Sequence, residues 1–449
     1  MKTRNLLKNL LALGAWLCLG TGDVFAQVSV TLDQAVEKAL ANNKLYHIKS
    51  LQVEEKTAKV QEDRVKAYPA FSVSSTYQYN ANIGQLSIAE GTLGVLPLPT
   101  GNVALPNNEL NVDLGRHQTF NAGASVYQPV SQLSKIKTGV QVALTDVEIA
   151  EREKVKVSLQ IMQAVERLYY GILINEKQKE EASAKLELAR LKLYDLESAR
   201  FSGKTIDSNE SGLLANIADE EQNLLKLDIQ NEDYMADMRR LTGLGSGEVR
   251  LEPVGELPFE TSRTVEDYKS VAGENNVDIQ LAILGRAKSE LAIKAAKLTY
   301  RPDLGVFAGY TYQKGNVIFP QNNPFAGLSL KWNVQDLWSN KQVLRQRYLV
   351  SEQARQHLAD KHDEVSNNVE KAYRKIRQAQ SLIQVAERAV TYRQKEMKVQ
   401  DDKKFAGLNT EADVLNTKSL LAKSEADLFA AQLSYRLAIS DLKILTEKY

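Results

Sequence analysis

The sequence predicts a mainly helical protein with a small transmembrane β part. Two stretches, residues 133–202 and 337–405, each run for about seventy residues without a proline. Their apolar residues recur mostly three, four or seven positions apart, a spacing typical of amphipathic helices with coiled-coil character. At 1.5 Å per residue, each helix is expected to be about 100 Å long. Helices of this length do not fit inside an ordinary globular domain.

Composition supports long helices and excludes one class of partner. The chain has 449 residues, of which only ten are proline, and a formal net charge of +1. Few prolines together with abundant Gln, Glu, Lys, Ala and Leu favour long helices over packed α/β domains. The nearly neutral charge, with no basic patch interleaved with aromatics, gives no indication of nucleic-acid binding.

The N-terminus has the organisation of a secretory signal. A basic start, an apolar run over residues 10–19 and small residues before position 27 predict a signal peptide over residues 1–26. The alternative is an uncleaved membrane anchor. The only cysteine, Cys18, lies in this segment, and the residue before it, Leu17, is too large for a lipoprotein site. The mature chain is therefore expected to carry neither a disulfide nor a lipid anchor.

The pattern of matching residues indicates an internal duplication of one structural unit. Asn42-Asn43 recurs 233 positions later as Asn275-Asn276, and Phe201-Ser-Gly recurs 204 positions later as Phe405-Ala-Gly. The change of offset predicts about 29 extra residues in the first repeat, between the two strands of its hairpin. The repeats are assigned to residues 27–243 and 264–449, with a linker or equatorial region over residues 244–263.

Each repeat is expected to contain a helix, two strands, a long helix and a shorter helix. Residues that can cap helices, and prolines that end them, set the boundaries. The first repeat is predicted as a helix over 32–67, strands over 69–80 and 118–130, a long helix over 133–202 and a helix over 206–242. The second is predicted as a helix over 265–299, strands over 302–313 and 325–334, a long helix over 337–405 and a helix over 410–446.

The four strands have one apolar and one small or polar face. No Asp, Glu, Lys or Arg occurs over residues 69–89, 118–134 or 315–330, and aromatics lie near the strand ends. Strands of nine to eleven alternating residues are the length that crosses a membrane. Four strands cannot close a barrel, because about eight are needed. We therefore expect a homotrimer with a 12-stranded barrel, continued by an α-helical tube and bearing the loop 81–117 outside. The alternative is two soluble hairpins packed on the helices.

The sequence resembles the TolC-like outer membrane efflux protein family, also called outer membrane factors. The resemblance rests on the duplicated layout, on Tyr127-Gln-Pro-Val and Lys331-Trp-Asn-Val closing the second strand of each repeat, and on two related segments, Arg200-Phe-Ser-Gly-Lys-Thr and Lys404-Phe-Ala-Gly-Leu-Asn. It covers nearly the whole mature chain. It implies a passive, trimeric channel-tunnel with its barrel in outer-membrane lipid and its tube in the periplasm. It also implies two partners, a periplasmic adaptor (membrane fusion) protein and an inner-membrane pump, and the export of small molecules or proteins.

The resemblance also implies roles for residues at the turns between long and short helices. These turns form the periplasmic tip, where glycine supports a positive φ or a close approach; an ordinary helix C-cap is the alternative for these glycines. The residues expected to contact the adaptor are Phe201, Gly203, Lys204, Phe405, Gly407 and Leu408.

Related channels line their constriction with acidic residues just beyond this motif. Asp413 matches the first acidic position, and Asn416 stands where the second carboxylate is found in the family. A threefold ring of Asp413 is expected to attract cations and to raise its own pKa values. Asp207 and Glu210 are candidates at the other tip; the alternative for them is a solvated helix start, where acids are favoured.

No enzyme, cofactor or metal site is expected. Gly203-Lys204-Thr205 lacks the earlier glycine of a phosphate-binding loop, since Ser198 is at that position, and no strand precedes it. His357 and His362 are five positions apart and lie on different faces of a helix. The remaining alternative is a soluble periplasmic coiled-coil scaffold or adaptor, which would share the helices but would not need four uncharged, alternating strands.

Overall fold

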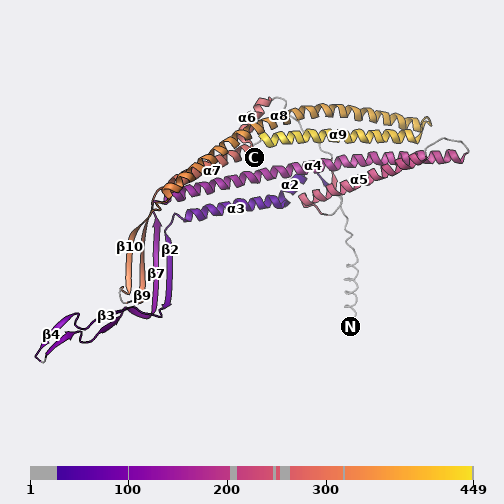
Figure 1. The fold of residues 1–449 in the computed structure, drawn as a ribbon. Helices are drawn as coiled ribbons and strands as arrows, with labels where there is room; N and C mark the ends of the chain where they lie inside the picture. Colours follow the sequence, from indigo (N-terminus) through magenta and orange to yellow (C-terminus); the bar gives the residue numbers. More distant parts are fainter. Residues whose placement is uncertain are drawn as a thin grey trace, which may run out of the picture. The chain divides into compact units, whose positions relative to one another are not determined.

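The computed structural model describes residues 28–99, 101–202, 210–245, 249–252, 263–316 and 319–446. The predicted signal peptide lies outside the described residues, as does much of the predicted linker. The chain divides into two compact units, whose elements are labelled in Figure 1. The first comprises Met1–Ser50, Arg152–Gln280 and Asp360–Tyr449, and the second comprises Leu51–Glu151 and Leu281–Ala359.

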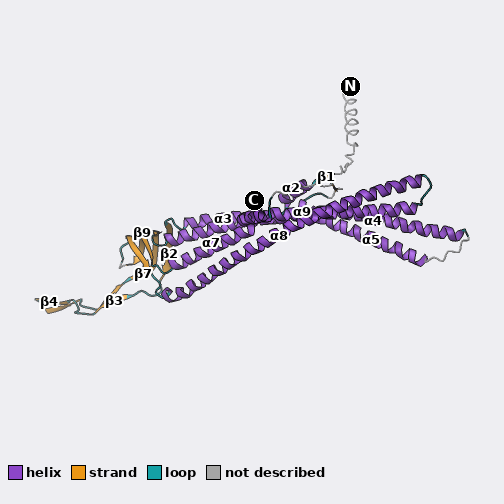
Figure 2. Ribbon diagram, turned by 90° about the horizontal axis from the view of Figure 1, so that it is seen from above, coloured by secondary structure: helices purple, strands orange, loops and turns teal. Residues whose placement is uncertain are grey.

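The two long helices are α4, Leu133–Phe201, and α8, Asp336–Phe405. They have 69 and 70 residues, so each is about 100 Å long at the rise of an α-helix. The shorter helices that follow them are α5, Glu210–Thr242, and α9, Glu411–Thr446. Figure 2 shows that helices account for most of the chain and that strands gather at one end of the second unit. None of the helices among the described residues has an apolar stretch suited to crossing a bilayer.

The first helix expected in each repeat is in fact two helices. The prediction of one helix over 32–67 is wrong, because the structure has α2, Leu32–Asn42, and α3, Lys44–Val65. Asn43 leaves helical geometry, with φ −72° and ψ 118°. Its Oδ1 accepts hydrogen bonds from the backbone N–H groups of Leu45 and Tyr46, at 2.9 and 3.2 Å. Asparagine caps a helix start in this way, so the chain restarts the helix one residue later.

The second repeat breaks at the equivalent asparagine. The helix expected over 265–299 is α6, Val265–Asn275, followed by α7, Val277–Leu298. Asn276 has φ −60° and ψ 130°, and its Oδ1 accepts from the N–H groups of Asp278 and Ile279 at 2.9 and 3.2 Å. The break is therefore part of the duplicated unit.

Both repeats begin with a capping box. The Thr31 side chain accepts from the backbone of Gln34, whose own side chain accepts from the backbone of Thr31. Thr264 and Asp267 repeat this exchange 233 positions later. The same pair of hydrogen bonds fixes the start of α2 and of α6.

The core of the first unit surrounds the middle of α4. Val165, Tyr169 and Ile172 are at most 1% exposed, and they pack in one cluster with residues of α2. The Tyr169 hydroxyl lies 2.9 Å from the carbonyl oxygen of Val30 and 2.7 Å from that of Glu252. It therefore anchors two short parallel strands, β1 (Val28–Val30) and β8 (Val249–Leu251), to the helix.

The second unit contains one four-stranded antiparallel sheet in the order β10-β9-β7-β2. The strands are β2, Ala70–Tyr79; β7, Gly115–Pro129; β9, Asp303–Asn316; and β10, Asn322–Lys331. At the helix end of the sheet, Lys135 pairs with Asp303, with 2.5 Å between Nζ and Oδ1. The ion pair holds the start of α4 against the start of β9.

The long loop 81–117 is not irregular throughout. It contains two antiparallel ribbons that extend from the β2–β7 hairpin (Figure 1). One pairs β3, Gln85–Ile88, with β6, Leu110–Asp113, and the other pairs β4, Gly94–Leu98, with β5, Gly101–Leu105.

Candidate functional site

The register of the sheet places the apolar residues of all four strands on one face. Val73 of β2 is paired with Ala124 of β7, which is paired with Tyr310 of β9. Val306 of β9 is in turn paired with Leu328 of β10. The expected apolar set therefore forms a continuous surface. Its side chains are strongly exposed in the single chain: 85% for Val73 and 82% for Leu328.

The opposite face carries mostly small and polar residues, together with the three aromatic residues Tyr127, Phe307 and Phe325. Ser72 of β2 and Ser125 of β7 are cross-strand partners whose hydroxyl oxygens are 2.8 Å apart. Gly309 of β9 and Phe325 of β10 continue the same row. A sheet with one apolar and one small, polar, largely uncharged face is suited to separating lipid from water.

The described parts of the helical tips expose large apolar side chains. Phe201 and Phe405 are 99% and 98% exposed, and Leu408 is 75% exposed. Gly407 has φ 70°, and the backbone N–H of Leu408 donates to the carbonyl of Lys403 at 2.8 Å. Nothing lies within 4 Å of a Cβ built on Gly407, so glycine is favoured there by its backbone conformation at the helix end. Gly203, Lys204 and Asp207 lie outside the described residues.

An ion pair joins the end of each long helix to the start of the shorter helix that follows it. Nη1 of Arg200 and Oε2 of Glu210 are 3.2 Å apart, and both side chains are well exposed. Lys404 pairs with Glu411 at the other tip. Glu210 therefore lies beside a cation of its own chain. The sequence pattern did not predict this ion pair. Exposed pairs of this kind contribute little to stability.

Asp413 has a structural role at the start of α9. Its Oδ2 accepts hydrogen bonds from the backbone N–H and the hydroxyl of Thr410, at 3.0 and 2.7 Å. These bonds lower the pKa of the Asp413 carboxyl. Within one protomer the pKa shift is therefore opposite to the rise expected from an acidic ring. Asn416 lies three residues farther along α9, and both side chains are exposed.

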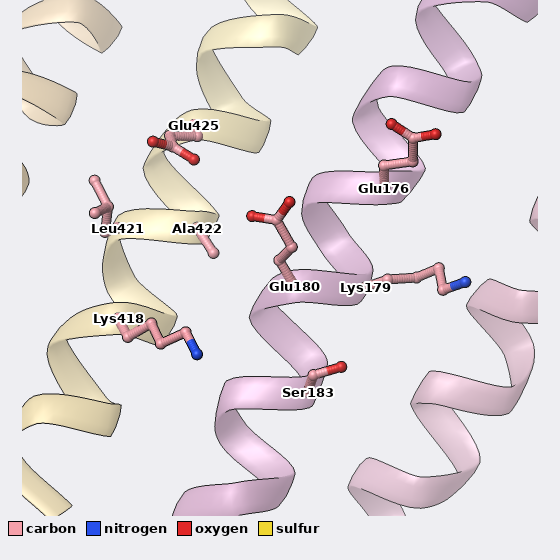
Figure 3. Close-up of a pocket in the computed structure, with 8 residues that line it drawn as sticks. All are labelled: Glu176, Lys179, Glu180, Ser183, Lys418, Leu421, Ala422 and Glu425. Carbon is pink, nitrogen blue, oxygen red and sulfur yellow. The ribbon is translucent and has the colours of Figure 1, made fainter. Parts of the chain in front are cut away.

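A groove of about 640 Å³ separates α4 from α9 on the way to the tips. Figure 3 shows Glu180 of α4 and Lys418 of α9 reaching into it. Burial raises the pKa of Glu176, and the neighbouring Glu180 carboxylate raises it further. Lys177 Nζ lies 3.2 Å from Glu425 Oε2, so the groove contains charges of both signs. Among the described residues no acidic, histidine or cysteine cluster could hold a metal ion.

A buried ion pair that the sequence did not indicate joins the two repeats. Glu166 of α4 and Arg436 of α9 are 3.7 Å apart, Oε1 to Nε, and each side chain is 12% exposed. Burial raises the pKa of the Glu166 carboxyl, while Ser440 and Arg436 oppose that rise. The i, i+3 and i, i+4 spacings of a single helix do not predict this pair, because its members are 270 positions apart in the chain.

Comparison with protein families assigns the second repeat. Residues 270–446 match the model of the family described as "Outer membrane efflux protein". No curated protein sequence matches the chain.

Comparison with solved structures shows the same fold over nearly the whole chain. The chain is similar to the CmeC outer membrane channel of Campylobacter jejuni, with a TM-score of 0.72, 12% identity, and coverage of 92% of this chain and 85% of that one. A membrane protein from Pseudomonas aeruginosa gives 0.69, with 12% identity and coverage of 93% and 90%. The outer membrane protein VceC from Vibrio cholerae gives 0.65, with 15% identity and coverage of 93% and 96%. The expected resemblance to the TolC-like outer membrane efflux proteins is thus confirmed by the family model over the second repeat, and the solved structures share the fold over nearly the whole chain.

Proposed function

We propose that three copies of this chain form a channel-tunnel that exports molecules across the outer membrane. The observation that carries the proposal is the sheet, with one apolar face, one small polar face and two edge strands that run in opposite directions. In the described chain β2 pairs only with β7, and β10 pairs only with β9. An edge with unpaired backbone groups cannot be left in lipid, so another copy must cover it.

The strand directions favour closure by identical copies. Because each of the four strands is antiparallel to its neighbour, the first and last strands of the sheet, β10 and β2, are antiparallel as well. The β10 strand of one copy can therefore pair with β2 of the next in the same antiparallel manner. Three copies give twelve strands, enough to enclose an open lumen. The exposed apolar face then contacts outer-membrane lipid and the polar face lines the channel.

The helices extend the conduit into the periplasm. With α4 and α8 each about 100 Å long, three copies supply a tube, and the exposed Phe201 and Phe405 side chains lie at its tips. Large exposed aromatic side chains are typical anchors for a protein partner. We assign them to contact with a periplasmic adaptor protein, which connects the tube to an inner-membrane pump. The chain itself acts as a passive conduit that opens at the tip.

Purified protein in detergent and in planar bilayers tests this function. We expect folded trimers on gels that dissociate on heating, and discrete conductance steps after insertion. Cell fractionation should recover the protein with the outer membrane. Recovery of a soluble monomer from the periplasm would contradict the channel and support a periplasmic scaffold instead.

A further inference from the structure

Three glycines on the polar face of the sheet lie beneath aromatic rings of neighbouring strands. In each case the far end of the ring reaches across to the glycine, so the ring lies along the sheet instead of projecting from it. Glycine within a strand commonly marks such a close approach. The pairs are Gly305 with Tyr127, Gly327 with Phe307, and Gly309 with Phe325.

Two of these glycines are constrained chiefly by a side chain. A Cβ built on Gly327 would lie 2.7 Å from Cζ of Phe307, and the three nearest atoms all belong to that ring. A Cβ on Gly305 would meet the Tyr127 hydroxyl oxygen, and the three nearest atoms again all belong to that side chain. Real Cβ atoms essentially never approach another atom so closely. Each ring occupies the space that any other residue would need.

The third glycine is constrained by backbone as well. A Cβ on Gly309 would lie 2.6 Å from Cζ of Phe325, but also 2.7 Å from the carbonyl oxygen of Ala124. The rings of Phe307 and Phe325 are themselves neighbours, with centroids 6.1 Å apart. Rings at that separation in a tilted arrangement attract each other.

The pairs fit only one strand register. Phe307 is directly opposite Gly327. A slip of one residue would turn Phe307 toward the other face, where apolar side chains are expected to meet lipid. A slip of two would place the ring over Phe325 or Ser329, the residues two positions on either side of Gly327, and both have a side chain. Each alternative loses the space beneath the ring.

We propose that the ring–glycine pairs lock the register of β7, β9 and β10, and that they hold three aromatic rings against the wall so that the bore stays open at its helix end. The bore rests on the proposed channel, whereas the register lock requires only the sheet. Covering a strand glycine with an aromatic ring is a known way to stabilise sheets.

The decisive experiment combines Gly327→Ala with Phe307→Ala. Gly327→Ala should force the ring off the sheet, lowering the temperature at which folded trimers dissociate and reducing single-channel conductance. The double variant should recover both properties in large part, because the clash has been removed. Ser329→Ala is the matched control, since it changes the same face of the same strand without adding a Cβ, and it should behave as wild type.

A second pair provides an internal contrast. Gly309→Ala should also destabilise the trimer, but Phe325→Ala should fail to rescue it because the carbonyl oxygen of Ala124 remains in the way. Rescue at position 327 but not at 309 supports the lock. The lock is overturned if Gly327→Ala has wild-type stability. It is also overturned if the double variant is no more stable than Gly327→Ala alone, and failure of the single and double variants to fold counts as failed rescue.

The outcomes separate this inference from the proposed function. If the wild-type protein never conducts but rescue of heat stability occurs, the channel falls and the register lock stands. If wild type conducts and rescue is absent, the lock falls and the channel stands. If heat stability is rescued and conductance never changes, the rings do not border the bore.

Discussion

Asn42 donates a hydrogen bond from its side-chain amide to the backbone carbonyl oxygen of Thr242, 2.9 Å away. The last carbonyl groups of a helix have no partner within it, and this bond supplies one at the end of α5. Asn275 donates to the carbonyl oxygen of Thr446 at the end of α9, at 3.2 Å. The duplication has therefore kept the contact between the end of the first helix of each repeat and the end of the last one.

Removing this amide should destabilise the first unit. Asn42→Asp keeps the size of the side chain but cannot donate, so the Thr242 carbonyl, in a residue with 0% exposure, loses a partner. We expect the free energy of unfolding to fall by about 1 kcal/mol, the usual net value of a hydrogen bond. Urea unfolding followed by circular dichroism measures it. Asn275→Asp should have a similar effect at the second junction, and wild-type stability in both variants would show that the bonds contribute nothing.

Tyr169→Phe should detach the short strands at the centre of the first unit. The hydroxyl is the donor nearest to the Val30 and Glu252 carbonyl oxygens. Without it the Val30 oxygen keeps only the Glu252 N–H at 3.4 Å, and the Glu252 oxygen loses this donor, a loss that costs roughly 1–3 kcal/mol for a buried acceptor. Burial raises the pKa of Tyr169 to about 12, so the hydroxyl remains a donor up to strongly alkaline pH. Hydrogen exchange at β1 should accelerate in the variant. Tyr194→Phe, at a 65% exposed position, is the control and should change neither exchange nor stability.

The sequence predicts the large elements of this fold because their signals are long. Heptad-like spacing over about seventy residues, and alternation over ten, are repeated often enough to outweigh chance. The faces of the sheet follow from the same alternation. β1 and β8 have three residues each, too few for a period to be recognised.

Other features depend on contacts that no local pattern contains. The Asn43 and Asn276 breaks were visible as repeated asparagines, but only the backbone shows that each asparagine caps a new helix. The capping bond between Asp413 and Thr410 could have been recognised from its Thr-x-x-Asp spacing. By contrast, the Glu166–Arg436 pair requires the packing of two helices from different repeats.

Stability should depend on pH through Glu166. Burial raises the pKa of this carboxyl, so between its unfolded and folded pKa values the folded state binds more protons than the unfolded state. The free energy of unfolding therefore decreases as pH rises through that window. Glu166→Gln cannot titrate, so its stability relative to wild type should increase over the same window. Parallel pH profiles, measured by urea unfolding, would mean that Arg436 already cancels the effect of burial.

Phe405→Ala should weaken adaptor binding without weakening the fold. The side chain is 98% exposed, so its removal costs the single chain almost no buried apolar surface. Capture of the periplasmic adaptor by chemical crosslinking should fall, while the heat stability of the trimer stays unchanged. Tyr392→Ala, at a 66% exposed position of α8 thirteen residues before Phe405, is the matched control. Equal loss of capture in both variants would refute a specific role for the tip.

Asp413→Asn separates the two roles of this residue at the start of α9. Asparagine keeps an oxygen that can accept from Thr410 but removes the charge, so cation block of the conductance should weaken while the trimer keeps its heat stability. Thr410→Val removes the hydroxyl partner and keeps the charge, and it should lower heat stability but retain the block. The hydrogen bonds from Thr410 lower the pKa of Asp413, so in wild type the carboxylate should stay ionised and the block should persist as pH falls to about 5. Loss of the block near pH 6 would mean that repulsion among three Asp413 side chains outweighs those bonds, and an unchanged block in Asp413→Asn would show that this residue does not line the constriction.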